Sequence, residues 1–293
     1  MAMWLELFAQ YNWLFLGVIG TVSLLIGSFL NVVIHRLPIM MERQWLQECA
    51  EGLATTPAKD EWPERYNLIT PGSNCPKCQA DIPAWRNIPL ISYLSQRGKC
   101  HNCHSPISIR YPLVELLTAL LCVAVAAKLG PTGLFLGTWL LCFGLIAAAA
   151  IDFDKMLLPD SITLPLLWLG LLLNIDTGFV TLADAVLGAA FGYLSLWSIF
   201  QGFKLLTGKE GMGYGDFKLL ALFGAWFGWQ ALLPIILISS IGGAVVGIAL
   251  TVTSKLDQGK PMPFGPWIII GGLSYLFYGP ELVNWYLHSV VGL

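Results

Sequence analysis

Residues 219–254 read LLALFGAWFGWQALLPIILISSIGGAVVGIALTVTS, a run of 36 residues without a charged side chain. A helix needs roughly 20 mostly apolar residues to cross a lipid bilayer, so this run is long enough for two such helices. The step Gly228-Trp229-Gln230 interrupts the run, and we expect the chain to turn there. The stretch predicts a membrane protein made of helices.

The composition of the whole chain agrees with this prediction. Of its 293 residues, 56% are hydrophobic and 12% are charged, and the mean hydropathy is +0.68. Soluble domains average roughly 25% charged residues, so a water-soluble enzyme is excluded. So high an apolar content also excludes disorder over most of the length. The net charge of −2 gives no electrostatic footprint for nucleic acid, and we expect no nucleic-acid partner.

Six further apolar stretches follow the same pattern. They are residues 13–34, 116–127, 133–151, 161–175, 185–203 and 261–279. Together with the two helices of residues 219–254, they give eight spans. We therefore predict an all-α, polytopic transmembrane bundle of about eight spans, with the lipid bilayer as its solvent.

The basic residues predict how the spans are oriented. If eight spans alternate, 15 of the 16 Lys and Arg residues fall on one side, with Lys128 opposite. Basic residues stay in the cytoplasm, so both termini are expected in the periplasm. Residues 1–36 then form a retained first span, residues 37–111 a cytosolic insert, and residues 112–293 a transmembrane core.

Two cysteine pairs lie in the insert. They are Cys75-Pro-Lys-Cys78 and Cys100-His-Asn-Cys103, with 21 residues between them. Two such pairs present four thiolates, the ligand set of a closed tetrahedral zinc site, with iron as the alternative metal. A site with four protein ligands leaves no open position, so the zinc would be structural. Disulfides are disfavoured because the cytosol keeps thiols reduced.

Two acidic residues lie close to the ends of apolar stretches, where ionisable groups are costly and usually functional. Asp152 directly follows residues 133–151, and Asp216 precedes residues 219–254. The basic residues place both aspartates at the same membrane face. Two carboxylates brought together do not both ionise easily, so one can activate a water while the other donates a proton. The pattern indicates an aspartic peptidase with Asp152 and Asp216 as its catalytic pair.

The glycines beside Asp216 carry a further expectation. Gly213 and Gly215 leave no side chain that would keep a backbone away from the carboxylate. An extended substrate could lie there as an added strand, held by main-chain hydrogen bonds.

Other acidic residues have plainer interpretations. Asp160 is expected to cap the N-terminus of the fourth helix, and Asp184 also fits a helix start. Asp154 fits a solvated loop charge. Glu115 lies just inside the second span, where it would either pair with a basic group or help to receive substrate.

Two more stretches are open to structural and functional interpretations. Gly27, Asn31 and His35 recur every four residues and so share one helix face, which favours close packing with interhelical hydrogen bonds over a ligand role. Residues 263–266, Pro-Phe-Gly-Pro, fit a turn before the last helix or a wall of the peptidase site.

Together these elements resemble the bacterial type IV prepilin leader peptidases, which are also N-methyltransferases. The resemblance runs from about residue 20 to residue 268 in consistent order, with no departure at any motif position. It is carried by both cysteine pairs and by residues 27–38, 110–118, 151–160, 211–218 and 263–266.

The resemblance implies more than the residues do. Such enzymes cleave the basic leader of type IV prepilins and type II secretion pseudopilins after a glycine, at the cytosolic face of the bacterial inner membrane. They then methylate the new N-terminal residue, usually Phe, from S-adenosylmethionine. The two catalytic aspartates of the family match Asp152 and Asp216, and Gly98 matches a glycine associated with methyl transfer. Its four cysteines match Cys75, Cys78, Cys100 and Cys103.

Two other classes of protein compete with this interpretation. In a proton-coupled transporter, Asp152, Asp216 and Glu115 would relay protons. A zinc-bearing assembly factor without catalysis would tolerate asparagine at both aspartate positions.

Overall fold

The computed structural model describes residues 8, 10–53, 62, 63, 65–176, 178–253 and 262–286. Within these ranges the chain is helical, with two isolated β-bridges and no strand, which confirms the all-α prediction. Two compact units form, Met1–Pro131 and Thr132–Leu293. The boundary between these units falls between the second and third predicted spans.

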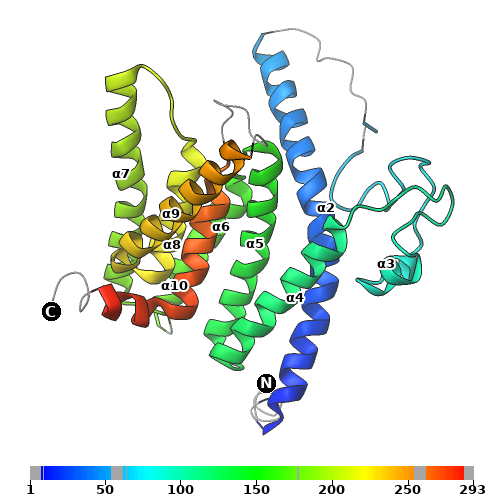
Figure 1. Cartoon of the computed structure of the whole chain (residues 1–293), viewed down its shortest axis with the longest axis horizontal. Helices are drawn as coiled ribbons and strands as arrows, with labels where there is room; N and C mark the ends of the chain where they lie inside the picture. The colour runs from blue at the N-terminus through cyan, green and yellow to red at the C-terminus, as the bar shows by residue number, and fades with distance from the viewer. Residues whose placement is uncertain are drawn as a thin grey trace. The chain divides into compact units, whose positions relative to one another are not determined.

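The helices that the structure describes are as follows. Unit 1 contains α2 (Asn12–Gly52), the 3-10 helix η1 (Ala84–Arg86), α3 (Ile91–Ser95) and α4 (Arg110–Leu129) (Figure 1). Unit 2 contains α5 (Gly133–Lys155), α6 (Asp160–Leu173), α7 (Leu182–Thr207), α8 (Tyr214–Phe227), the 3-10 helix η2 (Trp229–Ala231), α9 (Leu232–Val252) and α10 (Gly265–Tyr286).

Each predicted apolar stretch contains a helix. Residue 254, the end of one stretch, and residue 261, the start of another, lie outside the described residues. Among the described residues, five helical segments are long and apolar enough to cross a membrane: α2, α4, α5, α7 and Trp229–Val252. Helices α6 and α8 have 14 residues each, fewer than a straight crossing needs, so the count of eight spans stays a prediction. The turn at Gly228 is confirmed, because α8 ends at Phe227 and Gly228 has a φ of +78°.

In unit 1, α2 packs against α4 through the small and polar face predicted from the sequence. A Cβ on Gly27 would lie 2.9 Å from the Cα of Glu115, so glycine permits the close approach. The Asn31 side-chain amide donates to the Tyr111 carbonyl oxygen at 3.2 Å. The packing role of Gly27 and Asn31 is therefore confirmed. Helix α2 also continues through Pro38 to Gly52, well beyond the expected end of the span.

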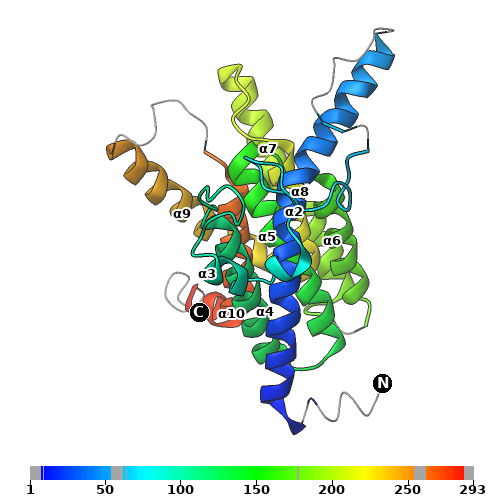
Figure 2. The ribbon, with the colours of Figure 1, turned by 90° about the vertical axis from the view of Figure 1, so that its right-hand side faces the viewer.

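In unit 2, α8 is the central helix. It contacts α6, α7, α9 and α10, and all but three of its residues are buried (Figures 1 and 2). A helix that is apolar all round is stable only where neighbours cover every side. Helix α10 packs against α5 and α9. This arrangement brings the end of α5 and the starts of α8 and α10 together.

Candidate functional site

Asp152 lies in the last turn of α5, and its side chain is buried. Helix α5 ends at Lys155. The next residue, Met156, adopts a left-handed conformation, and its backbone N–H donates to the Asp152 carbonyl oxygen. The carboxylate accepts a hydrogen bond from the backbone N–H of Gly265, with 3.0 Å between Gly265 N and Asp152 Oδ2. The first residue of α10 therefore fixes the orientation of this carboxylate.

Asp216 lies in the first turn of α8 and is also buried. The turn is held on one side by aromatic packing, since the Tyr214 ring lies 5.4 Å from the rings of both Phe200 and Phe217. Gly213 precedes the helix and makes no side-chain capping hydrogen bond. The backbone N–H of Gly213 nevertheless donates to the Asp216 carboxylate, so the position of Asp216 depends on this turn and on what packs around it.

The structure brings Asp152 and Asp216 together. The two carboxyl groups are close enough for the charge of one to act on the other, although they are 64 positions apart in the sequence. Both lie in buried positions, so a second negative charge beside the first is costly. The pair favours a state with one proton shared between two acids.

Leu158 lies against Gly215 and Gly265. Because these glycines have no side chains, the backbone comes close to the aspartate pair. A Cβ on Gly215 would lie 2.8 Å from the Leu158 Cβ, and one on Gly265 would lie 3.2 Å from the Leu158 Cδ1. Gly215 therefore makes room for Leu158 rather than for a substrate. Gly213 is open, because a Cβ added there would meet no atom nearer than the backbone N of Gly215 at 4.0 Å. Of the two glycines, Gly213 keeps the expected space for a peptide. Sequence reasoning missed Leu158, because a leucine in an apolar loop carries no signal.

The remaining acidic residues make structural contacts. The sequence suggested that Asp160 caps α6, and this prediction is wrong. Pro159 occupies the N-cap, and Asp160 pairs with Lys218 of α8. Asp184 lies at a helix start, as expected, and shares two hydrogen bonds with the N-cap residue Thr181. Asp154 is exposed, as expected, but it lies in the last turn of α5 rather than in a loop.

Glu115 ties the insert to helix α4 within unit 1. Its carboxylate accepts the backbone N–H of Leu90 at 2.8 Å, and it is hydrogen-bonded to the side chain of Ser28 in α2. Leu90 directly precedes α3, so Glu115 holds the start of that helix. Both hydrogen-bond donors, the Leu90 N–H and the Ser28 side chain, are uncharged. These contacts favour neither role expected for Glu115 from the sequence, pairing with a basic group or helping to receive substrate.

The four cysteines of the insert form one cluster. The Sγ atoms of Cys75, Cys78, Cys100 and Cys103 all lie within 4.8 Å of one another, and the cysteines form no disulfide. Cys75 and Cys103 have their Sγ atoms 3.8 Å apart, and Cys78 and Cys100 have theirs 4.0 Å apart. Four sulfurs at about 2.3 Å from one tetrahedral metal ion would be about 3.8 Å apart. The cluster therefore fits a metal ion.

The two cysteine pairs have the same local fold. In each, the backbone N–H of the first cysteine donates to a carbonyl oxygen five residues on, and the residue after the second cysteine has a positive φ. These two residues are Gln79 and His104. Backbone N–H groups of Cys78 and Lys77 point at the Cys75 sulfur and lower its pKa to about 6. A thiolate at neutral pH is the form that binds metal.

Gly98 connects α3 to the second cysteine pair. Its backbone N–H donates to the Tyr93 carbonyl oxygen, and its own carbonyl oxygen accepts from Ile107. The φ of Gly98 is +67°, and a Cβ would lie 3.0 Å from the Tyr93 Oη. Only glycine is accommodated here without strain.

Two family models match the chain. The bacterial peptidase A24 N-terminal domain matches residues 21–129, and the type IV leader peptidase family matches residues 139–248. The two matches lie within unit 1 and unit 2, respectively. No solved structure was found to match the chain.

Several proteins are similar to the chain over nearly their whole length, and each is named prepilin leader peptidase/N-methyltransferase. The protein of Aeromonas hydrophila is 56% identical over 98% of this chain and 99% of its own. That of Aeromonas salmonicida strain A449 is 53% identical over 99% of this chain and 100% of its own. That of Pseudomonas aeruginosa is 52% identical over 90% of this chain and 91% of its own.

Proposed function

The chain belongs to the type IV leader peptidase family, and from this membership we propose that Asp152 and Asp216 are its catalytic pair. It is a multi-pass membrane enzyme that removes the leader peptide of prepilins and methylates the product. A transporter or a non-catalytic assembly factor does not account for this membership. The observation that carries the proposal is the meeting of two buried carboxylates at the junction of α5, α8 and α10.

The pair performs hydrolysis as an acid and a base. The ionised carboxylate takes a proton from a water molecule held between the two acids, and the water oxygen attacks the carbonyl carbon of the scissile amide. The protonated carboxyl group donates its proton as the C–N bond breaks, and the leaving amine departs neutral. Because one proton enters the pair as the other leaves, the site returns to its starting state. The Gly265 N–H keeps Asp152 aimed at the water.

The experiment that tests the proposal is cleavage of a prepilin peptide by purified protein in lipid, with each aspartate exchanged for asparagine in turn. Wild-type protein should release the leader, and the products should show a cut after a glycine. Full activity in a folded Asp152→Asn or Asp216→Asn protein would refute the assignment.

Gly265→Ala is expected to lower kcat for cleavage about 10²-fold. The new Cβ would lie 2.6 Å from the Asp152 Oδ2, so the carboxylate must move, and misplacement by about 1 Å costs that much. Gly202→Ala in α7 is the matched control, since its Cβ would meet no atom within 4 Å. Initial rates on a prepilin peptide measure both. A wild-type kcat in Gly265→Ala would show that Asp152 does not depend on this close approach.

The methyl donor is S-adenosylmethionine in this proposal, and it binds within unit 1. A cavity of about 360 Å³ lies there between α2 and the insert. Ser28, Arg36, Asn87 and Pro89 are among its lining residues, beside apolar residues of α2. Small-molecule sites have about this volume and mix apolar walls with a few polar groups. Such a cavity also suits the methyl acceptor, whose polar N-terminus leads into an apolar helix.

Gly98→Ser is expected to reduce methyl transfer about tenfold or more while cleavage continues. A side chain at φ +67° is strained and displaces Tyr93, which shifts the link between α3 and the second cysteine pair. Gly72→Ser, in the same insert but with open space around its Cβ, should change neither activity. Methyl incorporation into pre-cleaved pilin and leader release from prepilin measure the two reactions. Equal loss of both would contradict the separation.

The remaining features of the proposal concern the metal and the surroundings. The four-cysteine cluster would bind Zn²⁺ as a structural ion, because four thiolates in a tetrahedron are its usual closed site. The enzyme lies in the bacterial inner membrane, with the aspartate pair and the cysteines on the cytosolic side, and it also processes type II secretion pseudopilins. Residues 1–36 form the first span, residues 37–111 the insert, and residues 112–293 the peptidase core.

A further inference from the structure

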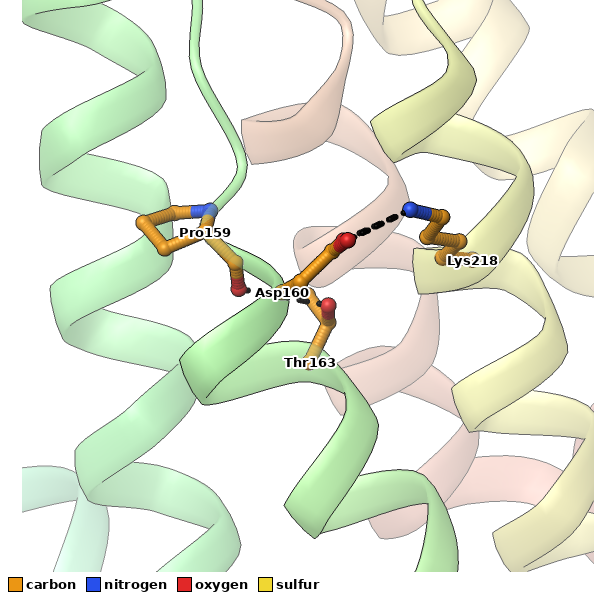
Figure 3. Close-up of polar contacts among 4 residues, drawn as sticks. All are labelled: Pro159, Asp160, Thr163 and Lys218. Atoms are coloured by element: carbon orange, nitrogen blue, oxygen red, sulfur yellow. Dashed lines mark hydrogen bonds and ion pairs between the residues drawn. The ribbon is translucent and has the colours of Figure 1, made fainter. Parts of the chain in front are cut away.

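Lys218 lies in α8, two residues after Asp216. Its side chain forms an ion pair with Asp160 of α6. The Lys218 Nζ lies 2.8 Å from Oδ1 and 2.7 Å from Oδ2 of Asp160, so both carboxylate oxygens accept from it (Figure 3). The Lys218 side chain is 29% exposed and that of Asp160 is 53% exposed. The pair is thus reachable by water but lies directly beside the turn that carries Asp216.

The start of α6 is a firm base for this contact. Pro159 precedes the helix, and the Thr163 hydroxyl donates to the Pro159 carbonyl oxygen at 3.2 Å, across the first turn (Figure 3). Asp160 occupies that first turn, where the helix dipole favours a negative charge. Its carboxylate is therefore in place for Lys218.

The ion pair is one of three polar links between α6 and α8. Further along, the Trp226 indole N–H donates to the Leu166 carbonyl oxygen at 2.8 Å. Near the end of α8, the Asn174 amide just beyond α6 donates to the carbonyl oxygens of Ala225 and Trp226. These contacts therefore hold α8 near both of its ends, and the ion pair is the link nearest Asp216.

The first turn of α8 needs such a link. The first backbone N–H groups of any helix lack intrahelical partners, and here the N-cap Gly213 supplies no side chain to satisfy them. Glycine also leaves the preceding backbone free to move. The Asp216 carboxylate itself accepts a hydrogen bond from the Gly213 backbone N–H. The ion pair of Lys218 adds the polar contact that ties this turn, and Asp216 with it, to α6.

We propose that Asp160 and Lys218 are a positioning pair that holds the first turn of α8, and with it Asp216, in register with Asp152. This rests on the proposed catalytic role of the two aspartates. Asp152 is fixed by the backbone N–H of Gly265. Asp216 accepts the Gly213 N–H within its own turn, and the ion pair ties that turn to α6. The two acids are thus held by different partners. Asp160 and Lys218 act through the first turn of α8 and do not touch the substrate.

A merely stabilising role is distinguishable from a positioning role. An ion pair this exposed contributes little to the free energy of unfolding, so its removal leaves the protein folded. Its removal still frees the turn, and reacting groups misplaced by a fraction of an ångström lose rate without losing substrate affinity.

The test is steady-state cleavage of a prepilin peptide by full-length protein in lipid. Lys218→Met and Asp160→Asn are each expected to lower kcat about tenfold with KM unchanged and the melting temperature kept. The double variant should lose no more than either single variant, since both changes break the same contact. Lys218→Arg should retain most of the rate. Glu210→Gln is the matched control: it breaks the ion pair Lys204–Glu210, also 2.8 Å long, keeps Lys204 over the Phe200 ring, and should leave kcat unchanged.

The outcomes separate the two proposals. A wild-type kcat in Lys218→Met and Asp160→Asn, beside an inactive Asp216→Asn, would overturn the positioning pair and leave the catalytic pair standing. A loss of rate in the two variants that is fully additive, or that a lower melting temperature accompanies, would also overturn it. An active Asp216→Asn would remove the proposed function itself.

Discussion

Asp152→Asn and Asp216→Asn are each expected to lower kcat for prepilin cleavage by about 10²–10⁴-fold, the usual contribution of a general acid or base. Asparagine keeps the shape of the side chain but neither takes up nor releases a proton at neutral pH. Both aspartates are buried beside one another, so replacing either also removes the like-charge interaction that keeps one of them protonated. The effect should therefore appear in kcat rather than in stability.

The double variant gives the sharper measurement. Two groups that act as one unit lose most of their effect when either is removed, so Asp152→Asn with Asp216→Asn should be little slower than each single variant. Asp154→Asn, an exposed neighbour on the same helix, is the control and should keep the wild-type rate. Losses that add up in the double variant would mean that the two aspartates act in separate steps.

Cys75→Ser is expected to release the bound metal and unfold the insert. Metal binding by four cysteines contributes about 10–16 kcal/mol to the folding of small zinc modules, so loss of one ligand is severe. Both cysteine pairs rely on short turns with a positive φ, at Gln79 and His104, which the metal would hold together. Methyl transfer should fall more than cleavage, because the aspartate pair belongs to unit 2.

Metal analysis of the purified protein and limited proteolysis of residues 62–109 measure this directly. Cys49→Ser is the matched control, since Cys49 lies on α2 and is not part of the cluster. An unchanged metal content in Cys75→Ser would contradict the assignment of the four ligands.

Features encoded by short spacings could be predicted from the sequence. The cysteine pairs are local motifs, and their spacing is enough to indicate a metal site. The turn at Gly228 follows from one glycine in a long apolar run, and the packing of Gly27 and Asn31 follows from the helical period.

Features that depend on how helices rotate against one another could not be predicted. The bond from the Gly265 N–H to Asp152 joins residues 113 positions apart, and the pair Lys218–Asp160 joins residues 58 positions apart. Asp160 looked like a helix cap because Asp commonly caps helices, but Pro159 already occupies the cap and frees the carboxylate for Lys218. No single stretch of sequence contains these contacts.

The shortness of α6, which packs on the equally short α8, has a consequence for the lipid beside it. Fourteen residues of helix extend roughly 21 Å, whereas the hydrocarbon layer is about 30 Å thick. A short helix that faces lipid, as α6 does, imposes a hydrophobic mismatch, which a bilayer meets by thinning locally and drawing its headgroups inward. Water then reaches deeper at this place than elsewhere, and a peptide bond at the edge of a substrate helix can be hydrolysed without that helix leaving the membrane.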